Sequence, residues 1–296
     1  LPLANLQDWE RCVRNEYDNA LESVYTSNWK FWESKTPRVT LLDLCSWDGY
    51  RREKALRAMG KNVPNQFFLS IVIRRLNDWV PQVRQTAQDI LSEALTKTKP
   101  SYVVGVICFT FSHWSSWQRI DNAHRETLLE ALSNEEIANQ LKLKLLAATS
   151  GPLTCIFSEV GRTSALDGCL EEIASEAIQP SLRAKVYRSL FEGKVSWCEG
   201  REWEWTDRRY NEGRWKNIIS SRQLTHTIQF EKLLSAAARD RSSFVRRVAA
   251  EFLIRNMESL GQEATSLAEH FSKDRSSAVA ERGMFALRKI SGKVDF

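Results

Sequence analysis

The sequence predicts an all-α protein in which pairs of helices stack on one another. Its 296 residues include only 7 prolines and 12 glycines, too few for the many turns of a β-sandwich or β-barrel. A short segment recurs after 34 residues, as Asp240-Arg241-Ser242-Ser243 and then as Asp274-Arg275-Ser276-Ser277. Around these copies the apolar residues follow the spacing of one helix face.

The recurring segment has matching positions earlier in the chain. An aspartate followed by Val-Arg and then by alanine also occurs in residues 78–87. Arginines occupy the matching positions: Arg52, Arg84, Arg183 and Arg246. Arg52 and Arg84 are 32 residues apart, and Arg84 and Arg183 are 99 apart, which is three times 33. A period between about 30 and 47 residues is typical of helical solenoids.

This pattern of Asp, Val-Arg, Ala and a later apolar residue resembles the HEAT and HEAT-like repeat family. The resemblance is good in residues 41–95 and 230–292 and weak in residues 100–170. It implies a right-handed α-solenoid of about seven helix pairs with a Trp-rich loop insertion, forming one domain over residues 1–296. It identifies an architecture and not an activity.

The predicted elements follow in chain order. Residues 1–40 are expected to form cap helices, because an amphipathic stretch runs from Leu6 to Tyr25. Residues 41–193 are expected to hold repeats, including a helix from Phe67 to Leu76 and a second helix that begins near Pro81. Residues 102–111 are β-branched and aromatic, but a lone strand between helical repeats would have no partner. We therefore expect a buried helix there.

Residues 194–222 do not fit the repeat, which resumes in residues 223–296. This segment holds four of the eleven tryptophans and two glycines, and it is predicted to be a loop inserted between helices. Insertions of this kind often carry the binding site of a solenoid. The candidate partner-binding residues are Trp197, Trp203, Trp205, Arg208, Arg209, Tyr210, Arg214 and Trp215. The alternative is that the rings fold back and plug the loop onto the helices.

If the segment binds a partner, we expect at least one of Trp203, Trp205 and Trp215 to be exposed in the free protein. Tryptophan and arginine dominate the energetics of protein interfaces. Three acidic residues, Glu202, Glu204 and Asp207, offset much of the basic charge in the segment. This balance argues against a purely phosphate-binding loop.

A second candidate site is the column of arginines near the start of the second helix in each pair. Its members are Arg52, Arg84, Arg183, Arg246 and Arg247. On the concave face of a solenoid they would form a basic surface for phosphates or for an acidic protein. The alternative is structural, with each arginine pairing with an aspartate such as Asp78, Asp240 or Asp274.

A third candidate is an enzyme, because some HEAT-like solenoids are alkylpurine DNA glycosylases. Trp117 and Asp121 are four residues apart and would share a helix face, and they look somewhat like the Trp-to-Asp segment of that family. The match then ends. The arginine expected one repeat later has only Lys142 or Lys144 near its position, and the second tryptophan falls near Tyr187. The alternative is a core tryptophan and a capping or solvated aspartate.

Composition narrows the class of protein further. Hydrophobic residues make up 43% and charged residues 27%, which excludes a disordered chain. The net charge of +5 permits an acidic partner or nucleic acid without requiring one. The six cysteines show no Cys-x-x-Cys spacing, so they predict mostly buried, reduced thiols in a cytoplasmic protein, with no metal site. No secretory signal or membrane span is expected, and the glycine patterns of nucleotide-binding loops are missing from the sequence, so no cofactor is predicted.

Together these observations predict a non-catalytic recognition module that binds a protein partner, as a scaffold, adaptor or inhibitor. The alternative is a HEAT-like protein that binds nucleic acid, with alkylpurine DNA glycosylase activity as its enzymatic form. The sequence indicates neither the partner nor the oligomeric state.

Overall fold

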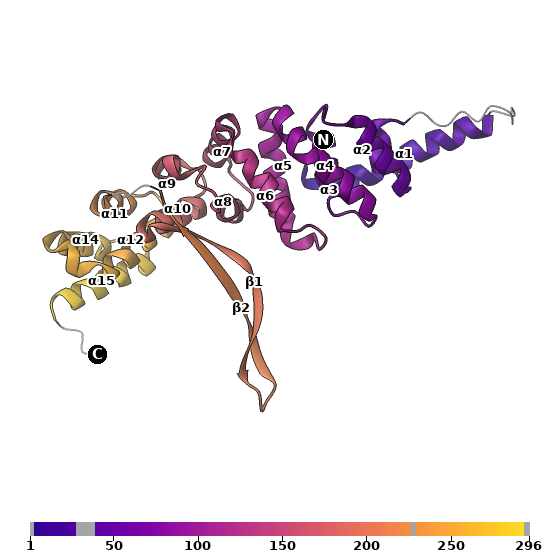
Figure 1. Ribbon diagram of the computed structural model, residues 1–296. Helices are drawn as coiled ribbons and strands as arrows, with labels where there is room; N and C mark the ends of the chain where they lie inside the picture. Colours follow the sequence, from indigo (N-terminus) through magenta and orange to yellow (C-terminus); the bar gives the residue numbers. More distant parts are fainter. Residues whose placement is uncertain (1–2, 28–38, 226–228, 293–296) are drawn as a thin grey trace. The chain divides into compact units, whose positions relative to one another are not determined.

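A computed structural model of the chain describes residues 3–27, 39–225 and 229–292 (Figure 1). These residues are mainly helical, and one two-stranded antiparallel sheet lies among them. The prediction of an all-α fold is therefore right for the helices and wrong for the segment that forms the sheet. Contacts divide the chain into two compact units, Leu1–Leu141 and Lys142–Phe296, where the sequence predicted one domain.

The first unit is built from α-helices joined by short 3₁₀ turns. The α-helices are α1 (Leu6–Ser27), α2 (Gly49–Met59), α3 (Gln66–Arg75), α4 (Pro81–Lys97), α5 (Pro100–His113), α6 (Asn122–Glu130) and α7 (Glu135–Ala147), in which the boundary to the second unit falls. The 3₁₀ turns are η1 (Leu3–Asn5), η2 (Leu41–Cys45), η3 (Trp114–Ser116) and η4 (Ala131–Ser133). The predicted amphipathic helix is α1, whereas Trp29 and Trp32 of the predicted cap lie outside the described residues.

Helices α3 and α4 show how the sequence sets one helix pair. Asn65 caps α3 by accepting a hydrogen bond from the backbone N–H of Phe68, at 3.2 Å. Pro81 occupies the first position of α4, where its missing N–H leaves no helical bond unmade. The β-branched segment 102–111 lies within α5 and is largely buried, so the helix expected there is confirmed.

The second unit continues with shorter helices and contains the sheet. Its elements after α7 are α8 (Leu153–Val160), η5 (Asp167–Cys169), α9 (Leu170–Glu176), α10 (Pro180–Glu192), β1 (Lys194–Asp207), β2 (Glu212–Gln223), α11 (Phe230–Ala238), α12 (Ser243–Arg255), α13 (Met257–Leu260), α14 (Gln262–Ser272) and α15 (Ser277–Ile290). Helices α10, α12 and α15 pack in that order, and α11 and α14 cover α12 and α15 (Figure 1).

Equivalent helix positions carry equivalent residues, which confirms the 34-residue offset. Val83, Val245 and Val279 each occupy the third position of their helix, and each side chain is fully buried. Four positions later the residue is small, as in Ala249 and Gly283. A Cβ atom on Gly283 would lie 2.2 Å from the backbone nitrogen of Ser272, so α15 approaches α14 too closely for a larger residue.

The predicted burial of the cysteines is wrong for half of them. Cys45 and Cys108 are buried, but Cys12, Cys155 and Cys198 are exposed. In the described ranges of the chain, no three or more histidine, cysteine or acidic side chains gather in a way that could hold a metal ion. None of the helices described combines the length and the apolar character needed to cross a membrane.

Candidate protein-binding hairpin

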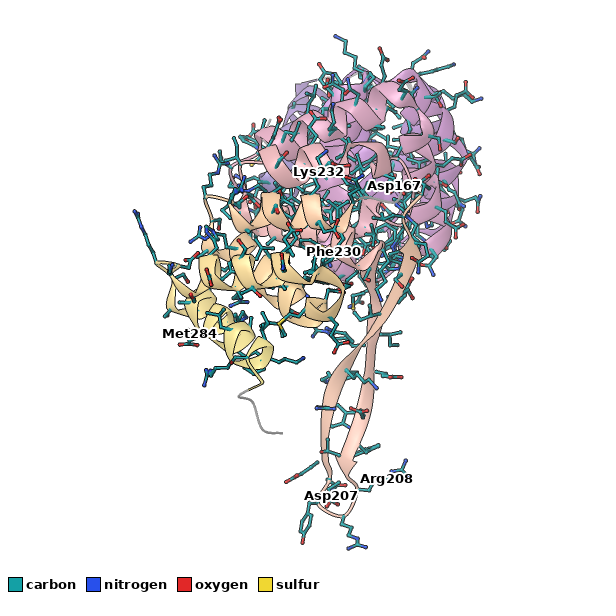
Figure 2. The ribbon with its side chains drawn as sticks, turned by 90° about the vertical axis from the view of Figure 1, so that its left-hand side faces the viewer. Asp167, Asp207, Arg208, Phe230, Lys232 and Met284 are labelled. Carbon is teal, nitrogen blue, oxygen red and sulfur yellow. The ribbon has the colours of Figure 1, made fainter. Side chains whose placement is uncertain are left out.

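The tryptophan-rich insertion is a long β-hairpin and not the loop that the sequence predicted. Strands β1 and β2 pair antiparallel from Lys194↔Gln223 at the base to Asp207↔Glu212 at the tip. The pairing is irregular between Cys198 and Gly200 and again between Trp205 and Asp207. The hairpin extends away from the helices of the second unit, so most of its length has solvent on both faces (Figures 1 and 2).

The base of the hairpin is fixed to the helices beside it. Val195 is buried against Gly161, where a Cβ atom would lie only 2.3 Å from a valine methyl carbon. Arg222 donates two hydrogen bonds to the carboxylate of Asp167, at 2.9 and 2.6 Å, and a third to the backbone oxygen of Gly161 at 2.6 Å. The backbone N–H of Thr225 donates to the same carboxylate at 3.0 Å. The strand that enters and the strand that leaves are thus both held at one end.

These contacts determine the charge state of Asp167. Burial alone raises the pKa of a carboxyl group, but here the hydrogen bonds from Arg222 and Thr225 outweigh burial and lower the pKa of Asp167 below its ordinary value. The carboxylate therefore stays ionised under physiological conditions and keeps the bidentate pair with Arg222.

Trp197 belongs to this base and not to the free part of the hairpin. Its indole N–H donates to Glu199 at 2.5 Å, and the guanidinium of Arg162 lies 5.0 Å from its ring centroid. Arg162 also pairs with Glu199 at 2.9 Å. Of the four tryptophans in the segment, this one fits the structural alternative of a ring that fastens the insertion to the helices.

The other three tryptophans gather on one face of the hairpin. Trp203 is directly opposite Trp215, and their ring centroids are 5.4 Å apart in an edge-to-face arrangement. The centroids of Trp203 and Trp205 are 5.6 Å apart at 88°. Relative exposures are 40% for Trp203, 47% for Trp205 and 64% for Trp215, so the expectation that at least one is exposed is confirmed. We call these three residues the tryptophan face.

Gly213 allows the tryptophan face to close over the strand. A Cβ atom on this glycine would lie 2.5 Å from the indole ring of Trp203, inside the contact distance. Ile219, on the same face nearer the base, is 59% exposed and is separated from the tryptophans by the hydrogen-bonded pair Arg201–Asn217. Apolar area of this kind in water is unfavourable unless a partner covers it.

The opposite face of the hairpin is charged and internally paired. Glu204 forms ion pairs with Arg214 at 2.9 Å and with Lys216 at 3.3 Å across the strands. Hydrogen bonds from Arg214 and Lys216 lower the pKa of Glu204. The sequence placed Arg214 among the tryptophans, but the strand alternation puts its side chain on the other face.

The remaining predicted residues form the turn at the tip. Arg208, Arg209 and Tyr210 are exposed, and Figure 2 shows Arg208 at the far end of the hairpin. Asp207 accepts a hydrogen bond from the backbone N–H of Arg209 at 2.8 Å. Asn211 has a φ of 54°, a left-handed conformation that asparagine tolerates. The tip therefore offers basic and aromatic groups beyond the tryptophan face.

Comparisons with known proteins assign no family. No family model matches the chain, and no curated protein matches it. Among solved structures it is similar to the designed armadillo repeat protein YIII(Dq)4CqI, with 15% sequence identity over 84% of this chain and 97% of that chain, at a TM-score of 0.28.

Three of the five arginines in the column, Arg52, Arg183 and Arg246, form largely buried ion pairs with aspartates, as the structural alternative predicted, whereas Arg84 and Arg247 do not. Arg52, Arg183 and Arg246 occupy the fourth position of α2, α10 and α12. Each donates from Nε and Nη2 to both oxygens of one aspartate. The pairs are Arg52–Asp78 at 2.9 and 2.7 Å, Arg183–Asp240 at 2.9 and 2.8 Å, and Arg246–Asp274 at 2.6 and 2.9 Å.

Each of these arginines also binds the turn that precedes its own helix. Nη1 of Arg183 donates to the carbonyl oxygen of Ala177 at 2.7 Å, and Nη1 of Arg246 donates to that of Asp240 at 2.9 Å. One side chain thus links its own turn to the aspartate of the next repeat. Arg84 contacts the turn before its own helix, through the carbonyl oxygen of Asp78, but does not pair with the carboxylate of an aspartate, and Arg247 is exposed.

The residues expected of a glycosylase do not form the expected helix face. Trp117 lies after η3, outside α6, and Asp121 is the residue that caps α6. Asp121 accepts a hydrogen bond from the backbone N–H of His124 at 3.1 Å, which is the capping role of the alternative. Lys142 pairs with Glu172 at 3.2 Å, and Tyr187 is buried.

Sequence reasoning missed two exposed tryptophans of the first unit. Trp47 and Trp79 are 70% and 78% exposed, and each lies two residues before its helix, α2 or α4. Arg14 lies over the ring of Trp47 at 4.0 Å, and Arg119 lies over the ring of Trp79 at 3.8 Å. Their 32-residue separation, equal to that of Arg52 and Arg84, was the available signal.

Proposed function

We propose that this protein is a non-catalytic scaffold of helical repeats that binds a partner protein through the tryptophan face of its hairpin. The scaffold we propose is a right-handed α-solenoid of the HEAT type, with about seven helix pairs, that acts in the cytoplasm. One observation carries the binding function: Trp203, Trp205 and Trp215 form an exposed aromatic cluster on a hairpin whose base is fixed to the helices.

The cluster has the properties of an interface hot spot. Tryptophans bury a large area and still offer an N–H donor, and they dominate binding energy where they are clustered. The edge-to-face contacts already restrict the three rings, so a partner would lose little side-chain entropy in binding them. The strands should also lose little entropy on binding, because the base of the hairpin is already anchored to the helices and the hairpin does not have to fold before it binds.

The distribution of charge favours a protein partner over nucleic acid. A site for a phosphate backbone needs unpaired basic groups along its length. On the hairpin, Arg214 and Lys216 are neutralised by Glu204 and lie on the face opposite the tryptophans. The other basic residues, Arg201 on the tryptophan face and Arg208 and Arg209 at the tip, do not form a continuous row along the hairpin. The tryptophan face and Ile219 instead present apolar surface, which suits a hydrophobic patch or groove on another protein.

The proposal is tested with a triple variant and a matched control. The full chain is immobilised, proteins retained from an extract of the native host are identified, and the affinity of each purified candidate is then measured. We expect Trp203→Ala/Trp205→Ala/Trp215→Ala to weaken binding of the true partner by more than about 2 kcal/mol. The control Arg214→Gln/Lys216→Gln changes the opposite face and should retain most of the affinity.

Circular dichroism and salt dependence complete the test. Helical content should be unchanged in the triple variant, because the three rings lie on the hairpin and outside the helices. Binding should depend weakly on salt, since an aromatic interface releases few counterions. Equal affinity of the triple variant and the unmodified protein would contradict the proposal, and so would a ligand that proves to be nucleic acid and dissociates steeply with salt.

A further inference from the structure

The series of arginine–aspartate pairs is broken at Arg84. This residue occupies the fourth position of α4, as Arg52 does in α2 and Arg246 does in α12. Its Nη1 donates to the carbonyl oxygens of Asp78 and Trp79, at 2.8 and 3.2 Å, which matches the turn contact of the other arginines. Its other two donor atoms, Nε and Nη2, are the ones that bind an aspartate in the other repeats, but among the described residues no carboxylate accepts from them here.

The sequence explains the missing carboxylate. In each complete pair the aspartate lies three residues before the first residue of the next second helix, as Asp78 does before α4 and Asp274 before α15. Three residues before α6, which follows α4 in the series, the chain has Arg119. A second arginine therefore occupies the position where the other repeats supply the counterion.

Arg119 is held at this position and carries an unneutralised charge. Its backbone N–H donates to the side chain of Asn77 at 2.8 Å, which ties its turn to the one before α4. Its guanidinium lies 3.8 Å from the ring centroid of Trp79, the residue whose carbonyl oxygen binds Arg84. Within the described part of the chain, no acidic side chain is paired with this guanidinium. Two arginines thus meet one exposed tryptophan.

A pocket of about 450 Å³ opens beside Arg119 and Trp79. Its lining includes Arg14, Trp47 and Arg74, and also Arg75, which pairs with both Glu10 and Asp78. Five arginines line it against two acidic side chains, so it carries an excess of positive charge. Three of the five already bind Glu10, and Arg52 binds Asp78, so Arg119 is the one whose guanidinium donors remain for a ligand within the described part of the chain.

We propose that Arg119, which lines this pocket, and Arg84, which binds the carbonyl oxygen of Trp79, together take a carboxylate from an acidic segment of a partner protein beside Trp79. The carboxylate takes the place of the aspartate that the repeat supplies at Arg52, Arg183 and Arg246. The ligand chemistry follows from these three pairs, because each arginine at this helix position takes a carboxylate in bidentate geometry. The site lies in the first unit and does not rest on the function proposed for the hairpin.

The test uses a fluorescein-labelled peptide of alternating aspartate and glycine, with an asparagine–glycine peptide of the same length as the control. Fluorescence anisotropy with the full chain at low salt should show binding of the acidic peptide only. Arg119→Gln removes the charge and should weaken binding at least about tenfold, the usual scale for a hydrogen bond to a charged group. Lys54→Asp, an exposed position on α2, is the control for a general change of charge and should retain binding.

Arg119→Asp separates this site from a general basic surface. The new aspartate should pair with Arg84 as Asp78 pairs with Arg52, so binding should be lost while the melting temperature rises by about 1–3 °C. A lower melting temperature for Arg119→Asp would overturn the proposed equivalence with the other repeats. Peptide binding equal to that of the unmodified protein in either Arg119 variant would overturn the site itself.

Two further measurements separate the ligand class and the site. Inorganic phosphate and a single-stranded oligonucleotide are each added as competitors of the labelled acidic peptide. The carboxylate assignment stands if neither displaces the peptide, or if displacement needs a much higher concentration of competitor than of acidic peptide. If either binds Arg119 more tightly than the acidic peptide does, the assignment is wrong. The triple tryptophan variant of the hairpin should bind the peptide normally, so failure of the hairpin proposal and failure of this one are distinguishable.

Discussion

Arg183 and Asp240 are 57 residues apart in the chain, yet they form a bidentate ion pair in which the arginine side chain is fully buried and the aspartate 6% exposed. The whole hairpin lies between them in sequence. The pair therefore joins the repeat before the insertion to the repeat after it. The hairpin residues do not themselves pack α10 against α12. Ion pairs between the repeats on either side of the insertion are therefore needed to stabilise that packing.

Replacing Asp240 with asparagine should therefore destabilise the second unit. The change leaves Arg183 buried without a counterion, and removal of one partner from a buried pair typically costs about 3–5 kcal/mol. Urea denaturation followed by circular dichroism measures the effect. The control is Asp8→Asn, which breaks an ion pair with Arg11 that is 66% exposed on both sides and should cost about 0–1 kcal/mol. Equal effects of the two substitutions would show that the buried pair does not hold the repeats together.

The arginine pairs could be predicted from sequence because they repeat. The 34-residue offset between Asp240 and Asp274 defined the length of the repeat, and aligning the chain on that repeat placed Arg52, Arg183 and Arg246 at the same helix position. The buried valines followed in the same way, since Val83, Val245 and Val279 share the third position of their helices and all three face the core. Arg84 departs from the rule because its partner position holds Arg119. A repeat pattern predicts the expected residue at a position and not an exception to it.

The hairpin was missed although its signal was present. Glu202, Trp203, Glu204 and Trp205 alternate charged and aromatic residues with a period of two, which is the pattern of a strand with two different faces. The prediction of a loop gave more weight to the two glycines than to this alternation. It also could not separate Arg214 from the tryptophans, because the face of a side chain is known only once the strand register is known.

The ion pair at the hairpin base should make stability depend on pH in the acid range. The pKa of Asp167 is lower in the folded protein than its ordinary value of about 3.9. Its contribution is therefore fully present above about pH 4 and is lost as the pH falls through the lower, folded-state value. We expect Asp167→Asn to lower the melting temperature at pH 7 and the difference from the unmodified protein to shrink as the pH falls from 4 to 3. A difference that stays constant with pH would show that the charge on Asp167 does not stabilise the base.

The glycine beneath the tryptophan face should be needed for its geometry. Gly213→Ala places a methyl group where the ring of Trp203 lies, at 2.5 Å, so the ring has to move away from its partners. Coupled indole rings give a strong near-ultraviolet circular dichroism signal, which should weaken in this variant. Gly200→Ala is the matched control, because its Cβ atom would meet nothing within 4 Å. An unchanged signal in Gly213→Ala would mean that the rings of the tryptophan face are not packed as described.

The cysteines provide a test of the fold on the scale of single side chains. Burial is the main cause that raises the pKa of Cys45 to about 11, with the charge of Glu10 adding to it, so at pH 8 this thiol is almost wholly protonated and is also shielded from solvent. Cys198 is exposed on the hairpin. A maleimide reagent at pH 8, with peptide mass spectrometry to locate the label, should modify Cys198 within minutes and leave Cys45 unmodified in the folded protein. In denaturant both should react at similar rates. Because Cys45 lies next to the Glu10 and Arg14 network, its modification in the native state would show that α1 is not packed against η2.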